Sequence, residues 1–584
     1  MGPTHRPLAG RKLPSHRHAI DLTRPKITPQ TPPCHPERSE RNLAGGESAG
    51  SAAAKCEDFG VLILKFLCYA FADSDCTMRS VLAISAVVLC LCMIPMTNGC
   101  SSESSPLPFT PPAPPPPPPP PPDPVGSNLT QISSDPFTVG PGQHATEVEP
   151  HVFANGATLV AAFQAGRIAP GCATDIGWAT STDGGNTWTH GVLPGLTTGE
   201  GSGPYYAASD PAVAYDAKHG MWMIASLPCG NTAPAVTVSR SSDGVNWQSP
   251  VGVDPMPVGS DKDWIVCDNW PTSPFYGNCY TEWDDPTIRM STSSDGGMTW
   301  SPPATTADSA TGIDGQPLVQ PNGNVVVPIQ LDSGTVASFS SADGGANWSA
   351  TVTIASLQTY ADPGIRSGPA VASAIDGAGT VWALWVDCRF RAYCSANDLV
   401  YSTSTDGVNW SAVTRVPIDA VSSTVDHFIP GIGIDPATSG ASAHVGITYY
   451  YYPQTGCSST SCQLFVGFVA SANGGTTWSA PVPLTAGAMG LSWLANSQYG
   501  PMVADYVATA FSNGVPHGVF AVARVNSGTT FDEAMYTGQG LTVTAAGRQF
   551  SSAGDRPLHK LSDKIVIERT ERGSVPPQQH KAKH

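Results

Sequence analysis

Residues 181–188 have the sequence Ser-Thr-Asp-Gly-Gly-Asn-Thr-Trp, a polar turn that ends in a large aromatic ring. Related stretches return at 242–247, 293–300, 341–348, 404–410 and 471–478, and an eroded copy occupies 526–531. The residues that define the repeat are Asp183, Trp188, Asp243, Trp247, Asp295, Trp300, Asp343, Trp348, Asp406, Trp410, Asn473 and Trp478. The aromatic positions follow one another at a mean spacing of about 57 residues, a length that holds one four-stranded propeller blade.

The chemistry of this repeat is structural. An Asp side chain can accept hydrogen bonds from backbone N–H groups a few residues further on, and Gly adopts positive φ without a steric penalty. The Trp that follows buries a large ring against neighbouring strands. The repeat therefore predicts a tight turn between two strands rather than a reactive site.

Apolar runs precede each copy of the repeat. Before the first copy they are residues 150–153, 158–163 and 175–180, and before the eroded copy they are 501–504 and 518–522. These runs are typical of the first three strands of a blade, with the repeat as the turn from the third strand to the fourth. We expect an all-β propeller of four-stranded blades over residues 137–545, with seven blades, or six if the last unit closes or decorates the circle.

The charge of this body limits its partners. Residues 100–546 hold 10 Lys and Arg against 34 Asp and Glu, a net charge of −24. Lys218 and Lys262 are its only lysines, so no basic stripe can form along it. We therefore expect no nucleic-acid partner.

The repeats resemble the Asp-box (BNR) repeats of sialidase-like propellers, over the whole of residues 137–545. Two further stretches, Asp261-Lys-Asp-Trp264 and Trp385-Val-Asp-Cys-Arg-Phe-Arg391, resemble secreted bacterial proteins described as sialidase-like or BNR-repeat proteins. The resemblance implies a sialidase-type glycoside hydrolase that acts on extracellular glycans, or a non-catalytic propeller that binds a glycan or a cell-surface protein.

Sialidases use three arginines to hold the substrate carboxylate, a Tyr–Glu pair as nucleophile and an Asp as acid and base. The resemblance therefore implies a catalytic set of Arg167, Arg366, Arg389, Tyr499, Glu282 and Asp210, in which Arg391, Tyr360 and Asp263 are alternatives. Substrate-binding residues would be Asp261, Lys262, Asp263 and Arg391. The chain departs from the family pattern because no Arg-Ile-Pro or Arg-Leu-Pro stands in the first blade; Arg167-Ile-Ala-Pro170 follows the second strand instead.

Each of these residues also has a structural interpretation. Arg389 and Arg391 can pair with Asp387 and Asp398 to fix a loop, and Lys262 can pair with the aspartates on either side of it. The Asp210-Pro211 dipeptide is typical of a turn that leads into a strand. No cofactor is required for the expected chemistry. Clustered carboxylates allow Ca²⁺, whereas the spacings typical of zinc sites are absent from the sequence.

The N-terminal region predicts export. Residues 78–99, with an apolar run from Val81 to Met96, resemble a lipoprotein signal peptide, so that Cys100 would carry the lipid. Plain secretion and an uncleaved anchor are the alternatives. Residues 1–77 are then not expected in the mature protein, 100–136 form a Ser/Pro-rich linker, and 546–584 form a basic, flexible tail. Membrane contact is expected only through the lipid.

The cysteines of the body agree with export. Eight follow Cys100, namely Cys172, Cys229, Cys267, Cys279, Cys388, Cys394, Cys457 and Cys462. The short separations within the last three pairs predict local disulfides formed in an oxidising compartment, and the alternative is free buried thiols.

Overall fold

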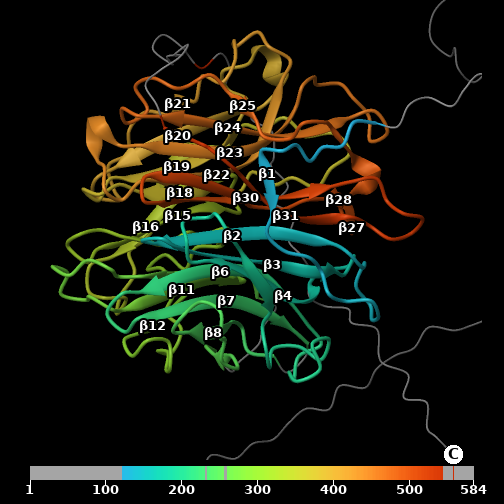
Figure 1. Cartoon of the computed structure of the whole chain (residues 1–584). Helices are drawn as coiled ribbons and strands as arrows, with labels where there is room; N and C mark the ends of the chain where they lie inside the picture. Colours follow the sequence, from blue (N-terminus) through green and yellow to red (C-terminus); the bar gives the residue numbers. More distant parts are fainter. Residues whose placement is uncertain (1–120, 231–232, 255–259, 544–556, 558–584) are drawn as a thin grey trace, which may run out of the picture. The chain divides into compact units, whose positions relative to one another are not determined.

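The structure is a computed structural model that describes residues 121–230, 233–254, 260–543 and Pro557 of the 584. The chain divides into two units, Met1–Pro114 and Pro115–His584, and all described residues belong to the second. The expected export signal, Cys100 and most of the basic tail lie outside the described residues. Regular structure in the described part consists of strands and three short 3-10 helices, Ala392–Cys394, Gly440–Ser442 and Leu491–Trp493 (Figure 1).

No helix of the described residues is long and apolar enough to cross a membrane.

The first eight strands of the body form one continuous sheet. They are β2 (Glu147–Asn155), β3 (Thr158–Arg167), β4 (Ala173–Ser181), β5 (Thr189–Val192), β6 (Ala207–Asp216), β7 (Met221–Cys229), β8 (Thr237–Ser241) and β9 (Val251–Gly252). The sheet consists of two antiparallel four-stranded groups joined by the pair Ala173–Ala208. Strands β3 and β4 are buried along almost their whole length, and alternate side chains of β3 belong to two different hydrophobic clusters.

The next three groups follow in chain order. One sheet contains β10 (Asp261–Cys267), β11 (Cys279–Asp285) and β12 (Thr287–Ser293). Another contains β13 (Gly312–Ile313), β14 (Leu318–Val319), β15 (Val325–Leu331), β16 (Thr335–Ser341) and β17 (Val352–Ser356). A third contains β18 (Ala372–Ile375), β19 (Val381–Asp387), β20 (Asp398–Ser404) and β21 (Thr414–Arg415).

The C-terminal groups complete the body. They contain β22 (Asp426–Ile434), β23 (Val445–Tyr452), β24 (Gln463–Ser471), β25 (Val482–Pro483) and β26 (Met489–Gly490), then the hairpin of β27 (Ala495–Ser497) and β28 (Gly500–Met502). The last sheet has β29 (Ala508–Ser512), β30 (Val515–Ala523) and β31 (Glu533–Gly538), and β1 (Leu129–Gln131) pairs with β31. A strand from the expected linker therefore completes the C-terminal sheet. The folded body thus begins before residue 137, the boundary expected from the sequence.

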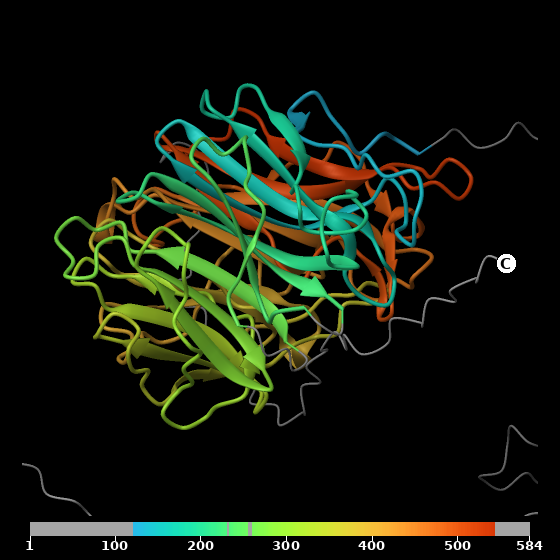
Figure 2. The same cartoon turned by 90° about the horizontal axis from the view of Figure 1, so that it is seen from below.

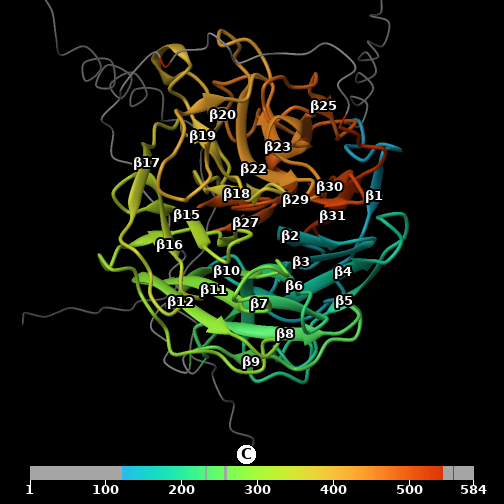
Figure 3. The same ribbon diagram turned by 90° about the vertical axis from the view of Figure 1, so that its left-hand side faces the viewer.

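The groups close into a circle. Strand β2 contacts β6, β6 contacts β10, β10 contacts β14, β14 contacts β18, β18 contacts β22, and β22 contacts β29. The circle is completed by contacts between β29 and β2 (Figures 2 and 3). The fold is an all-β propeller, as the repeats predict.

Two details of the predicted fold are wrong. The described residues form five sheets of four or more strands, not seven or six, because the first two groups share one sheet and β10–β12 stay three-stranded. The innermost strand of the last group is β29, not residues 501–504, which contribute β28 to a separate hairpin.

The turns of the repeat have the predicted geometry. The Asp183 carboxylate accepts hydrogen bonds from the backbone N–H of Asn186 (3.1 Å) and of Thr187 (2.9 Å), and Gly185 donates to Ser181 Oγ (2.9 Å). Gly184 and Gly185 have φ of 72° and 86°, which explains the glycines. Hydrogen bonds, first from Thr187, hold the pKa of Asp183 at about 2. The exposed carboxylate of Asp183 therefore stabilises the turn.

The cysteines pair as disulfides. The predicted local pairs Cys267–Cys279, Cys388–Cys394 and Cys457–Cys462 are confirmed. Cys172 and Cys229 form a fourth disulfide, which ties the loop between β3 and β4 to the end of β7. The alternative of free thiols does not hold for these eight residues.

Candidate functional site: a charged cluster at the centre of the propeller

The innermost strands share an irregularity that directs polar residues to one region. Glu149 in β2, Asp210 in β6, Lys262 in β10 and Asp314 after β13 have positive φ values of 56°, 53°, 20° and 62°. The register of β2, β6 and β10 shifts at these positions. A bulge of this kind bends the strand and redirects a side chain. The strained backbone therefore places four charged groups close to the centre of the circle.

The first part of the cluster is built around Arg167 at the end of β3. Arg167 Nη1 donates to Gln164 Oε1 (2.6 Å), and Gln164 Nε2 in turn donates to the Glu149 carboxylate. Arg167 is 1 % exposed. Its Nε and Nη2 donate to no described residue. Two buried donor groups of this arginine are therefore still able to bind an acceptor.

The second part comes from loops that precede β18 and β29. Arg366 Nε donates to Asp505 Oδ1 (2.9 Å), and Nη2 donates to Oδ2 of the same carboxylate. The guanidinium group also lies 5.7 Å from the centre of the Tyr499 ring, which is 40 % exposed. A backbone hydrogen bond from Arg366 to Pro501 (2.8 Å) fastens the loop to the β28 hairpin. The guanidinium group of Arg366 is therefore already paired with a carboxylate, that of Asp505.

The third part surrounds Lys262. Its Nζ donates to the Asp263 carbonyl (2.9 Å) and lies 3.7 Å from the centre of the Tyr506 ring and 4.7 Å from that of Trp264. Glu282, in β11, is 1 % exposed, and its two carboxyl oxygens accept no hydrogen bond from the described residues. A Cβ on Gly315 would lie 2.5 Å from Glu282 Cδ, so only glycine leaves room for this carboxyl.

We name nine of these residues the central charged cluster: Glu149, Arg167, Asp210, Lys262, Glu282, Asp314, Arg366, Asp505 and Tyr506. Its electrostatics follow from burial and like charges. Burial, followed by the charges of Asp210 and Asp505, raises the pKa of Glu149 well above its usual value. Burial likewise raises the pKa of Asp314 to about 7, although Lys262 opposes the shift. Glu282 has a raised pKa through burial and then Asp284. The cluster therefore holds carboxyl groups that stay protonated at pH values where exposed ones are ionised.

The structure brings together only part of the set implied by the resemblance. Arg167, Arg366, Asp210, Lys262 and Glu282 lie in the cluster, and Tyr499 lies beside Arg366. Asp261 and Asp263 flank Lys262 in β10 and are buried. Tyr360 instead donates its backbone N–H to Asn397 (2.8 Å).

Two arginines of the implied clamp are engaged elsewhere. Arg389 pairs with Asp387 (2.6 Å) and donates to the Ser356 carbonyl (2.6 Å). Arg391 is fully buried and pairs with Asp398 and Asp419 (both 2.6 Å). Both pairs match the structural interpretation, in which the arginines fix the loop between β19 and β20. Arg366 pairs with Asp505, and Asp362, four residues before Arg366, accepts a hydrogen bond from Ser367 (2.5 Å).

Sequence reasoning did not select Glu149, Asp505 or Tyr506. One signal was present, since Glu149-Pro150 and Asp210-Pro211 are acidic residues before proline at equivalent places in two innermost strands. Asp505 and Tyr506 were missed because residues 501–504 were assigned to a strand of the last blade.

One group of side chains has the spacing of metal ligands. Ligand atoms of Asp398, Asp419 and His427 all lie within 4.8 Å of one another. Arg391 and Arg415 both pair with each of the two carboxylates, at 2.6–2.8 Å. Two positive charges already neutralise two negative ones, so a divalent cation would leave an excess of positive charge. The group is therefore better suited to an ion-pair network than to a metal.

Comparisons with known proteins give no family. No family model and no curated protein matches the chain. Among solved structures, a Dyadobacter fermentans protein of unknown function is 16 % identical with a TM-score of 0.38, covering 59 % of this chain and 100 % of its own. A leech intramolecular trans-sialidase is 14 % identical with a TM-score of 0.35, covering 73 % and 70 %. The intramolecular trans-sialidase of Ruminococcus gnavus is 14 % identical with a TM-score of 0.34, covering 72 % and 100 %.

These neighbours include sialidases, at low identity. The propeller assignment made above depends on the strand pairing of this chain and not on these similarities.

Proposed function

We propose that the protein is an extracellular propeller that acts on glycans at the central charged cluster, as a glycoside hydrolase. The observation that carries the proposal is the contrast between two carboxyl groups. Glu149 is buried among like charges that favour its protonated form, whereas Asp505 is bound at both oxygens by Arg366. Glycoside cleavage needs one carboxyl group that donates a proton and one that is ionised.

In this mechanism Glu149 protonates the oxygen of the leaving sugar. Asp505 then serves as nucleophile or as the base that activates water, depending on its distance from Glu149 across the substrate. Arg167 has two buried donor groups that can bind sugar hydroxyls, and the exposed Tyr499 ring offers a stacking surface. Asp210 lies close enough to contribute to the field at Glu149.

The arrangement favours an uncharged sugar over sialic acid. A substrate carboxylate would have to displace Asp505 from Arg366, and it would meet the carboxyl groups of the cluster. The third arginine of a sialidase clamp is held by Asp387 or by Asp398. We therefore expect a sialoside to be a poorer substrate than an uncharged glycoside.

The four disulfides support an oxidising, extracellular location. The second candidate is a non-catalytic module that binds a glycan or a cell-surface protein at the same cluster. The bidentate ion pair of Arg366 with Asp505 favours this candidate, because such a pair can stabilise the fold without taking part in catalysis.

The test is hydrolysis of a panel of aryl glycosides and an aryl sialoside, with and without Ca²⁺. We expect Glu149→Gln and Asp505→Asn to lower kcat/KM about 100-fold or more. Asp183→Asn is the matched control, because the sixth copy of the turn has Asn473 at this position, and Asn473 Oδ1 accepts the same hydrogen bond from the backbone N–H of Thr477. Binding of a glycan without hydrolysis would leave the second candidate.

A further inference from the structure

A separate cavity lies along the innermost strands. It has a volume of about 480 Å³ and is lined by residues of β2, β6, β10, β14, β18, β22 and β29. Trp264 contacts Lys262 of the central charged cluster and also lines this cavity. From there the lining extends to Asn155, at the far end of β2 from Glu149. The cavity is therefore distinct from the cluster and adjoins it at Trp264.

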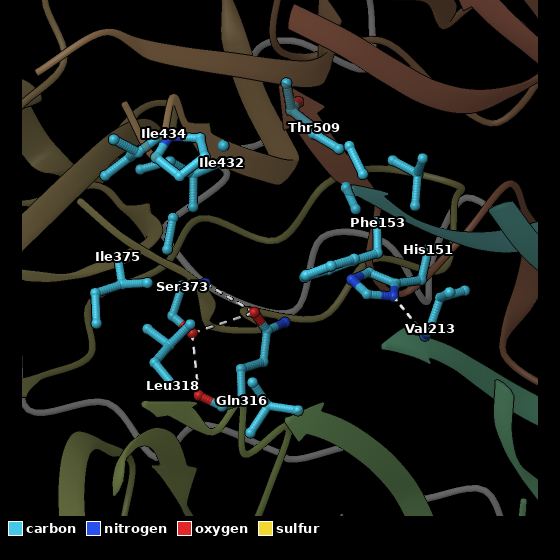
Figure 4. Close-up of a pocket in the computed structure, with 18 of the residues that line it drawn as sticks. His151, Phe153, Val213, Gln316, Leu318, Ser373, Ile375, Ile432, Ile434 and Thr509 are labelled. Carbon is cyan, nitrogen blue, oxygen red and sulfur yellow. Dashed lines mark hydrogen bonds between the residues drawn. The ribbon is translucent and has the colours of Figure 1, made fainter. Parts of the chain in front are cut away.

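The lining is neutral and mainly apolar. Phe153, Leu318, Ile375, Ile432 and Ile434 contribute apolar side chains (Figure 4). The described lining residues include no Asp, Glu, Lys or Arg. Water in such a space finds few hydrogen-bond partners, and apolar cavities bind small apolar molecules readily.

One hydrogen-bond donor in the cavity is His151. The backbone N–H of Val213 donates to His151 Nδ1 (2.8 Å), so Nδ1 is the acceptor of the ring and the proton resides on Nε2. Burial, followed by the charge of Lys262, lowers the pKa of His151 to about 3, which keeps the ring neutral. Nε2 donates to none of the described residues. The ring thus offers one N–H group to the cavity.

The second donor is Gln316. Its Oε1 accepts hydrogen bonds from the backbone N–H of Ser373 (2.8 Å) and from the Ser373 hydroxyl (3.4 Å), which fixes the orientation of the amide. The side-chain NH₂ group of Gln316 is consequently the end of the amide that can bind a ligand. It donates to no acceptor within the described part of the chain. Figure 4 shows His151, from β2, and Gln316, from the loop that precedes β14, directed into the same cavity.

We propose that this cavity is a binding site for a neutral, largely apolar molecule that carries a hydrogen-bond acceptor such as a carbonyl oxygen. The apolar lining supplies affinity by removing the body of the molecule from water. The two N–H groups select the acceptor, because a hydrocarbon of the same shape leaves both of them unpaired. The volume suits a bicyclic ketone, within the range of small-molecule pockets.

The probe is prodan, a neutral naphthyl ketone whose fluorescence shifts to the blue in apolar surroundings. We expect saturable, blue-shifted binding of one prodan per chain of the full-length protein. Ile375→Trp fills the cavity and should weaken binding about tenfold or more, whereas Val515→Trp adds the same ring at an exposed hairpin and should not change it. Leu318→Phe replaces Ile375→Trp if that variant fails to fold, as judged by circular dichroism.

A pair of competitors isolates the acceptor. In the wild-type protein, 2-acetylnaphthalene and its hydrocarbon counterpart 2-isopropylnaphthalene should both displace prodan. Gln316→Met should weaken binding of the ketone by about three- to tenfold, because the substitution removes one neutral hydrogen bond. Binding of the hydrocarbon should be unchanged. Absence of saturable binding, or equal binding to Ile375→Trp, would overturn the proposal. An equal effect of Gln316→Met on both competitors would overturn the role of the donor.

Discussion

Arg366 and Asp505 are 139 residues apart in the chain, yet the guanidinium group of Arg366 donates two hydrogen bonds to the Asp505 carboxylate. Arg366 precedes β18 and Asp505 precedes β29, and β22 contacts both of these strands, so the packing of three successive groups brings the pair together. Arg366 is 5 % exposed and the Asp505 side chain 21 %. The pair connects the stability of the propeller to the geometry of its central charged cluster.

This pair predicts strong coupling between the two residues. Arg366→Ala or Asp505→Ala each leaves a charge without its main partner and should lower the free energy of unfolding by about 2–4 kcal/mol. The double variant should lose much less than the sum of the two, because neither charge is then left behind. Denaturant unfolding of the four proteins gives the coupling energy. Additive losses would show that the pair does not act as a unit.

A second prediction concerns pH. Burial raises the pKa of Glu147 from its usual 4.5 to about 8. Because the folded protein holds this proton more tightly, the stability contribution of Glu147 is fully present below pH 4.5 and is lost as the pH rises through 8. Each pKa unit corresponds to about 1.4 kcal/mol, so the loss amounts to a few kcal/mol.

Glu147→Gln removes this titration. Melting temperatures measured from pH 5 to pH 8 should fall less steeply in Glu147→Gln than in the wild type, because the neutral amide cannot lose a proton. The charge of Glu147 also raises the pKa of Glu533, so the Glu147→Gln variant removes this contribution together with the titration of Glu147 itself. Parallel pH profiles would contradict the assignment of a protonated Glu147.

The disulfides should differ in what they contribute. Cys172–Cys229 closes a loop of 57 residues and Cys388–Cys394 one of 6. By loop-closure entropy, replacing both cysteines with Ala should cost about 4 kcal/mol for the first pair and about 2 kcal/mol for the second. Unfolding of the two double variants measures this order. A larger loss at Cys388–Cys394 would indicate that its loop, which holds Arg389 and Arg391, depends on the disulfide for more than entropy.

Strand β1 predicts a role for the N-terminal segment in completing the last sheet, where it pairs with β31. A protein that begins at residue 121 retains the pairing of β1 with β31, and one that begins at residue 133 loses it. The shorter protein should melt at a lower temperature and associate more readily, because the edge of β31 is exposed. Equal melting temperatures and equal light scattering would show that the last sheet is stable without β1.

Much of the fold could be predicted from the sequence because the repeat is local. Asp183 and its equivalents reveal the turns within a few residues, and the short Cys388–Cys394 separation reveals its disulfide. The single pair Ala173–Ala208, which merges two groups into one sheet, involves residues with no distinguishing side chain.

The cluster was predicted less completely. Lys262 and Asp210 could be selected because they stand where the chain enters the first strand of a blade, on the face opposite the Asp-box turns, which is where the resemblance places a site. Glu149 was missed because an even alternation of strand residues contains no bulge, and the bulge is what redirects this side chain. Asp505 was missed because the ion pair with Arg366 joins residues 139 apart in the chain, a long-range contact that no local pattern encodes.

Cleavage of glycans by the central charged cluster is tested by the release of aryl alcohol from a panel of glycosides by the wild type, by Glu149→Gln and by Asp183→Asn. We expect turnover of at least one uncharged glycoside, a loss of about 100-fold or more in Glu149→Gln, and full activity in Asp183→Asn. No turnover of any glycoside by the wild type, or unchanged turnover by Glu149→Gln, would contradict this expectation.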